Sequence, residues 1–112
     1  EIPDFDGCRN LKEISLYNNT LTNYRRGSFL KLYKIRFIDL SNNKLNQTAQ
    51  DKILTDLIDN YTIYKRGNVT VNLRGNRNST TNALESPSDE VKEKALTLVA
   101  NGWKITVNGG LT

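Results

Sequence analysis

The sequence predicts an α/β solenoid of about four short parallel strands, stacked in chain order, with two helices on the convex side. Three observations support this fold: a segment that repeats after 24 residues, four stretches in which apolar residues alternate, and two stretches with helical spacing. A chain of 112 residues is long enough to bury one core. We therefore expect residues 1–112 to form a single domain.

The repeat appears when residues 5–21 are shifted onto residues 29–45, because seven aligned pairs then keep their chemical type. The pairs are Phe5 with Phe29, Cys8 with Leu32, Leu11 with Ile35, Ile14 with Ile38, Leu16 with Leu40, Asn19 with Asn43, and Leu21 with Leu45. Both copies resemble the leucine-rich-repeat consensus L-x-x-L-x-L-x-x-N-x-L. The resemblance implies a short leucine-rich-repeat solenoid.

In each copy the alternating apolar residues predict a strand, at residues 13–16 and 36–40, with its leucine and isoleucine directed into the core. The following Asn19 and Asn43 are expected to be structural, since an amide can satisfy the backbone polar groups of the turn. Cys8 is expected to be a small buried hydrophobic residue.

Beyond the two copies the helical spacing predicts a first convex helix at residues 48–59, capped by Asn46 or Thr48 and ending before the β-prone stretch 61–64. Its inward face is expected to contain Ala49, Ile53, Leu54, Leu57 and Ile58. A third strand follows at residues 69–73, and Asn76 follows Leu73 as Asn43 follows Leu40.

Residues 77–85 are rich in Asn, Ser and Thr and predict an exposed loop. Ser86 and Pro87 are typical of a helix start and predict a second helix at residues 87–101, stopped by Asn101 and Gly102. The expected inward face of this helix consists of Val91, Ala95, Leu96 and Val99. The fourth strand is predicted at residues 103–107.

The residues of opposite parity on each strand predict an exposed binding face across the sheet. We expect it to consist of Ser15, Tyr17, Phe37, Asp39, Ser41, Thr70, Asn72, Arg74, Lys104, Thr106 and Asn108. Phe37 is the most informative of them, because an exposed aromatic side chain on a polar face is more often a contact residue than chance. The alternative is that its ring tucks under a neighbouring side chain.

Composition argues against catalysis. The chain has one cysteine and no histidine, which removes the usual zinc ligands and the common nucleophile–base pairs. The carboxylate pairs Asp56 with Asp59 and Asp89 with Glu93 look like solvated helix faces. We predict no catalytic residues, no metal, no cofactor and no small-molecule substrate. The net charge of +4 comes from scattered basic residues, so nucleic-acid binding is not expected, and no stretch is apolar enough for a membrane span.

Residues 38–45, 50–57, 69–76 and 94–107 together are similar to leucine-rich-repeat segments of bacteriophage tail and other virion structural proteins. The similarity covers about residues 35–108. The chain departs from that pattern at Arg74-Gly75-Asn76 and at the basic, aromatic insert 61–66. The resemblance implies a non-catalytic interaction module located in a virion, with other virion proteins or a host-surface receptor as partners.

The alternative is an extracellular or cell-surface leucine-rich-repeat domain for adhesion or recognition. Five glycosylation sequons, at Asn18, Asn46, Asn60, Asn68 and Asn78, fit that alternative but are also expected from a chain so rich in Asn and Thr. Because the chain starts at Glu1, we expect it to be processed or part of a longer protein.

Overall fold

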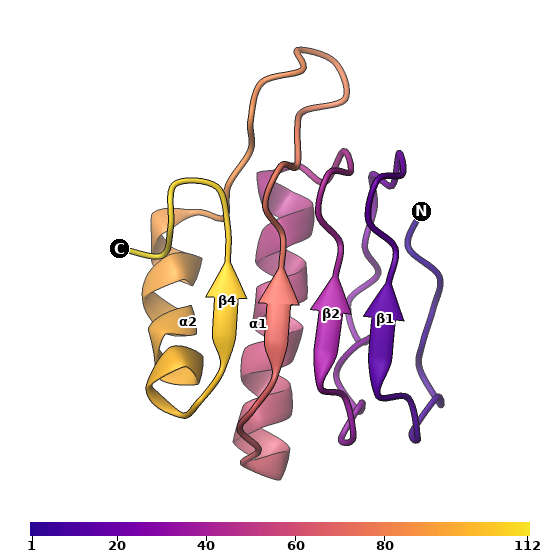
Figure 1. Ribbon diagram of the computed structural model, residues 1–112, viewed down its shortest axis with the longest axis vertical. Helices are drawn as coiled ribbons and strands as arrows, with labels where there is room; N and C mark the ends of the chain where they lie inside the picture. The colour runs from indigo at the N-terminus through magenta and orange to yellow at the C-terminus, as the bar shows by residue number, and fades with distance from the viewer.

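The computed structural model describes residues 1–112 and contains one four-stranded parallel sheet covered on one face by two helices (Figure 1). The strands follow chain order: β1 (Glu13–Ser15), β2 (Phe37–Asp39), β3 (Thr70–Asn72) and β4 (Lys104–Thr106). The helices are α1 (Gln47–Tyr64) and α2 (Asp89–Ala100). The predicted fold class, with four parallel strands and two helices, is confirmed. Each strand lies inside its predicted range.

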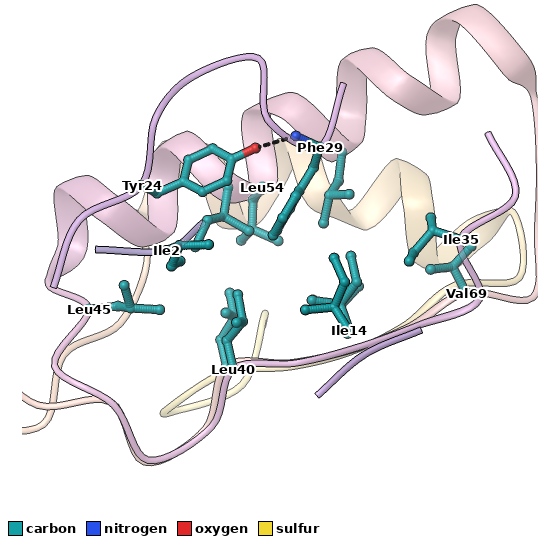
Figure 2. Packing of buried hydrophobic residues seen from close by; sticks show 14 of the residues in the cluster. Ile2, Ile14, Tyr24, Phe29, Ile35, Leu40, Leu45, Leu54 and Val69 are labelled. Atoms are coloured by element: carbon teal, nitrogen blue, oxygen red, sulfur yellow. Dashed lines mark hydrogen bonds between the residues drawn. The ribbon is translucent and has the colours of Figure 1, made fainter. Parts of the chain in front are cut away.

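The core lies between the sheet and the helical layer, and the inward-facing strand residues form its floor (Figure 2). Ile14, Ile38 and Val71 stand side by side in register and are buried, as is Leu40 at the end of β2. Leu16 also points inward but is only half-buried, because β1 lies at the edge of the sheet and has a neighbouring strand on one side only. The predicted inward parity of the strands is therefore confirmed.

Helix α1 begins where the sequence indicates and ends later. The side chain of Asn46 accepts a hydrogen bond from the Ala49 N–H and caps the first turn. The helix continues through the stretch 61–64 to Tyr64, where Lys65 adopts a left-handed conformation and ends it. The prediction of an end near residue 59 was wrong because Asn60 is not a helix stop. Its buried amide instead donates to three backbone carbonyls of the preceding repeat.

Helix α2 starts two residues later than predicted, since Ser88 is its cap and accepts a hydrogen bond from the Val91 N–H. Its inward face also differs from the prediction. Leu98 is fully buried with Ala95, whereas Val99 is 43% exposed. Ala95 and Leu98 lie three residues apart on the inward stripe, and Val99 is about 100° further around the helix than Leu98, which places its side chain on the outer side.

The N-terminal segment packs against the first repeat and covers that end of the core. Ile2 is buried, its N–H donates to the Asn23 carbonyl, and the ring of Phe5 lies 6.0 Å from that of Phe29. Cys8 is exposed, so the expectation that it is buried was wrong. Its counterpart Leu32 lies inside the stack, but the turn containing Cys8 belongs to the terminal repeat, which has a neighbouring repeat on one side only.

Asp56 fixes the irregular convex segment of the first repeat to α1. Its carboxylate is fully buried and accepts hydrogen bonds from the Tyr24 hydroxyl at 2.6 Å, the Gly27 N–H at 2.6 Å and Arg26 Nε at 2.7 Å. The Tyr24 hydroxyl in turn accepts the Phe29 N–H at 2.8 Å (Figure 2). The interpretation of Asp56 as solvated was therefore wrong, because apolar spacing alone does not reveal a buried carboxylate that is paired with a half-exposed arginine.

Replacement of Leu40 by alanine is expected to lower the free energy of unfolding by about 2–5 kcal/mol, because it leaves a cavity between sheet and helices. Leu16→Ala should cost less, since Leu16 is already half-buried. Urea unfolding followed by circular dichroism measures both. Equal losses for the two variants would contradict the difference in burial between Leu16 and Leu40.

Replacement of Tyr24 by phenylalanine tests the buried network through its pH dependence. Burial, followed by the hydrogen bond to Asp56, raises the pKa of Tyr24 well above its usual value near 10. The native protein therefore keeps this proton when the unfolded chain ionises, and stability falls as pH rises above about 10. Tyr24→Phe should lose about 1–3 kcal/mol at neutral pH. It should also show a shallower alkaline decline in urea unfolding; parallel declines would exclude this role for Tyr24.

Candidate functional site: the open face of the sheet

The face of the sheet opposite the helices presents aligned rows of side chains, and all eleven predicted binding residues lie on it. We call it the open sheet face. Strand register places Phe37, Thr70 and Lys104 in one row and Ser15, Asp39, Asn72 and Thr106 in the next. The turn residues Tyr17, Ser41, Arg74 and Asn108 follow beyond the strand ends. The bonds from Asn18 N–H to the Ser41 carbonyl and from Asn42 N–H to the Arg74 carbonyl continue the register into these turns.

Glu13 also belongs to the open sheet face, although we did not predict it. It is exposed and pairs in register with Phe37, so it completes the first row. The repeat contained this signal, because a shift of 24 residues places Glu13 on Phe37. Counting parity backward from Ser15 leads to the same residue.

Some side chains of the open sheet face form hydrogen bonds within the chain. Ser41 is buried and donates its hydroxyl to Asp39 Oδ1 at 2.6 Å, and Asn72 Oδ1 accepts the Arg74 N–H at 3.0 Å. Asn108 is bound most completely: Oδ1 accepts the Gly75 N–H, and Nδ2 donates to the carbonyls of Asn76 and Glu85. Asn108 is thus a structural residue at the rim.

The remaining side chains of the face form no hydrogen bond or salt bridge within the chain; they are Ser15, Tyr17, Phe37, Thr70, Arg74, Lys104 and Thr106, with Glu13. Tyr17 is 52% exposed and Phe37 is half-buried among polar neighbours. Two aromatic rings and several charges are therefore available to a partner.

Charge is divided across the open sheet face. Both acids, Glu13 and Asp39, lie on β1 and β2, whereas the bases lie on β4 and just after β3, at Lys104 and Arg74. Glu13 and Lys104 share a row but are three strand spacings apart, about 14 Å, so they cannot pair with each other. A partner with the opposite division of charge would match this face.

Two buried asparagines, Asn43 and Asn76, stabilise the turns that follow the strands and contain the last residues of the open sheet face. Asn43 Nδ2 donates to the carbonyls of Leu16, Leu40 and Ser41 at 2.9, 3.1 and 3.2 Å, and its Oδ1 accepts the Leu21 N–H. It thereby joins the turn of its own repeat to the turn of the repeat before. The predicted structural role of Asn43 is confirmed.

Asn76 repeats this arrangement one repeat later. Its Nδ2 donates to the carbonyls of Leu40 and Leu73 at 3.0 and 2.8 Å, and its Oδ1 accepts the Leu45 N–H at 3.1 Å. Asn19, at the end of the stack, is exposed and donates only to carbonyls of its own turn. Asn19 belongs to the first repeat, so no turn of an earlier repeat lies beside it to accept a bond from its side chain.

The rest of the chain shows no second candidate site. No group of three or more His, Cys, Asp or Glu residues is placed to hold a metal ion. A hollow of about 400 Å³ lies between the first repeat and the start of α1, lined mostly by polar residues and with Glu1 and Lys52 as its charged members. Neither helix combines the length and apolarity needed to cross a membrane.

Of the five sequons, the one at Asn60 is inaccessible, because that amide is buried and bonded to carbonyls.

Comparison with known families agrees with this geometry. A family model described as leucine rich repeat matches residues 5–45, and this segment is a leucine-rich repeat. The match covers β1, β2 and both turns that follow them. No curated protein and no solved structure matches the chain. Leucine-rich repeats are generally non-catalytic and indicate a protein-interaction module.

Replacement of Asn76 by alanine is expected to destabilise the chain by about 2–4 kcal/mol, because the Leu73 carbonyl and the Leu45 N–H lose their side-chain partner in the interior, whereas the Leu40 carbonyl keeps its bond from Asn43. Asn19→Ala is the matched control and should cost less than about 1 kcal/mol, since its turn is exposed to water. Thermal unfolding of both variants measures the difference. Similar costs would show that the amide does not act by joining repeats.

Proposed function

We propose that this chain is a non-catalytic interaction module that binds a protein partner through its open sheet face, as a component of a phage virion. The proposal depends chiefly on the unpaired side chains of that face, which stand in register on a rigid sheet. Two aromatic rings and separated acidic and basic groups suit a protein surface better than a small substrate. The open face also has no cleft that could enclose one, as the only hollow lies on the helical side.

The virion context rests on the resemblance of residues 35–108 to repeat segments of tail and other virion structural proteins. Such a module would join neighbouring subunits of a particle or attach it to a host-surface receptor. The four stacked strands support the proposal in one respect, because a stack that keeps its side chains in fixed rows loses little freedom on binding.

The double variant Phe37→Ala, Arg74→Ala tests both parts of the proposal. Removing an aromatic and an arginine from the face should weaken the contact by about 10-fold or more, while the fold survives because neither residue is fully buried. The matched control is Lys92→Ala, Val99→Ala, which removes a charge and an apolar group from α2. Circular dichroism monitors the fold, and the amount of each variant in purified particles monitors assembly.

Reduced incorporation of the double variant alone supports the open sheet face as the contact. Equal incorporation of parent and both variants would place the contact elsewhere. If the parent protein itself is missing from purified particles and is found on the cell surface, the virion context is wrong and the adhesion module takes its place.

A further inference from the structure

Basic residues that are scattered in the sequence gather along the edge of the sheet where the strands begin. Residues 8–12 and 31–36 precede β1 and β2, residues 61–69 join the end of α1 to β3, and residues 101–104 lead into β4 (Figure 1). These segments hold eight of the sixteen lysines and arginines and none of the twelve acids. The rest of the chain has more acids than bases, so the net charge of +4 conceals a polarised molecule.

Seven of these cations are exposed. Lys104 lies on the open sheet face, and we call the other six the basic edge: Arg9, Lys12, Lys31, Lys34, Arg36 and Lys65. None of them forms a salt bridge, because every ion pair of the chain involves Arg25, Arg26 or Lys94. Arg66 lies beside the edge and donates to the carbonyls of Leu32 and Ile35. Desolvation and the nearby charge of Arg36 lower the pKa of Arg66, as expected where positive groups meet without a carboxylate.

An apolar and aromatic tip adjoins the basic edge. The C-terminal end of α1 projects beyond the start of β3 (Figure 1), and Ile63 in its last turn is 56% exposed. The ring of Tyr64 lies 5.7 Å from that of Tyr33, which is itself 36% exposed. A large exposed aliphatic residue beside amphipathic tyrosines and lysines has the composition of an interfacial contact with lipid.

We propose that this end of the molecule docks on a membrane surface rich in anionic phospholipid, with the basic edge against the headgroups and Ile63 and Tyr33 inserted at the interface. Each lysine or arginine near such a surface strengthens binding, and several together give appreciable attraction. The site is distinct from the open sheet face. Both can therefore be occupied at once, which would hold a protein partner close to a bilayer.

The same charges could attract single-stranded nucleic acid, but the aromatic groups favour lipid. Base stacking needs a free ring face. Tyr64 is already tilted against Tyr33, the Lys34 ammonium lies 5.7 Å from the Tyr33 ring centre, and Lys65 lies 5.2 Å from that of Tyr61. Ile63 also has no role in stacking, whereas an exposed isoleucine gains free energy on entering a lipid interface.

Sedimentation with phosphatidylcholine vesicles, with or without phosphatidylserine, tests this inference on the intact chain. We expect binding only when phosphatidylserine is present, weakening as salt is added. Reversal of three charges, Lys12→Glu with Lys31→Glu and Lys34→Glu, should reduce the partition coefficient on the order of 100-fold. These side chains make no hydrogen bond, so the fold should persist, as circular dichroism would verify.

The matched control reverses Lys52, Lys92 and Lys94, which are on the helices outside the basic edge and give the same net charge; it should bind within about 3-fold of the parent. Ile63→Ser should lower binding by about 5- to 10-fold without altering its salt dependence. Equal loss in both triple variants, or equal binding to vesicles lacking phosphatidylserine, would overturn the proposal. Binding of a labelled single-stranded oligonucleotide in place of the vesicles would also overturn it.

Discussion

The structure depends on satisfying backbone polar groups inside a stack of very short strands. Each strand has only three residues, so the ladder between strands supplies few hydrogen bonds. The turns after the strands must therefore also be joined across repeats. Asn43 and Asn76 do this with one amide each, which bonds carbonyls of two successive turns and one N–H. Because a buried unpaired backbone group is costly, these two amides fix the spacing of the repeats and so the rows of the open sheet face.

A related requirement shapes the helical side. The first repeat has no convex helix, and its irregular segment between β1 and β2 leaves N–H and carbonyl groups facing α1. Polar residues four apart on α1 meet them: Asp56 accepts the Gly27 N–H, and Asn60 donates to carbonyls near Phe29. Just after the helix, Arg66 donates to the Ile35 carbonyl and also to the Leu32 carbonyl, which Asn60 contacts as well. Helix α1 thus both packs on the core and supplies the hydrogen bonds that the helix-free repeat lacks.

This explains which parts of the fold the sequence could predict. Strand positions and inward parity depend on local apolar alternation, which the 24-residue repeat reinforces, and Asn43 follows from the same pattern. The sequence predicts Asp56 to be a solvated residue of the helix surface and Asn60 to be a helix end, because both residue types are common there. Both are buried because they bond to backbone groups of the preceding repeat, which the sequence alone does not place beside α1. Val99 was assigned to the wrong side because the sequence does not reveal how α2 is rotated about its axis, and the structure places Ala95 and Leu98 inward instead.

The two candidate surfaces, the open sheet face and the basic edge, also differ in how far the sequence predicts them. The residues of the open sheet face could be predicted, because side chains alternate between the two faces along each of the four strands. Asn108 is the exception, since its hydrogen bonds within the chain leave its side chain unavailable to a partner. The basic edge was not predictable from charge patterning, because its members come from separate repeats as singles or pairs. A parallel sheet in chain order brings every strand start to one edge, so a modest excess of lysine and arginine at equivalent positions accumulates there. The acids lie in the N-terminal segment, the two helices, the loop before α2 and the open sheet face. The polarity of the molecule therefore depends on the parallel topology, which gathers the strand starts and their basic residues at one edge.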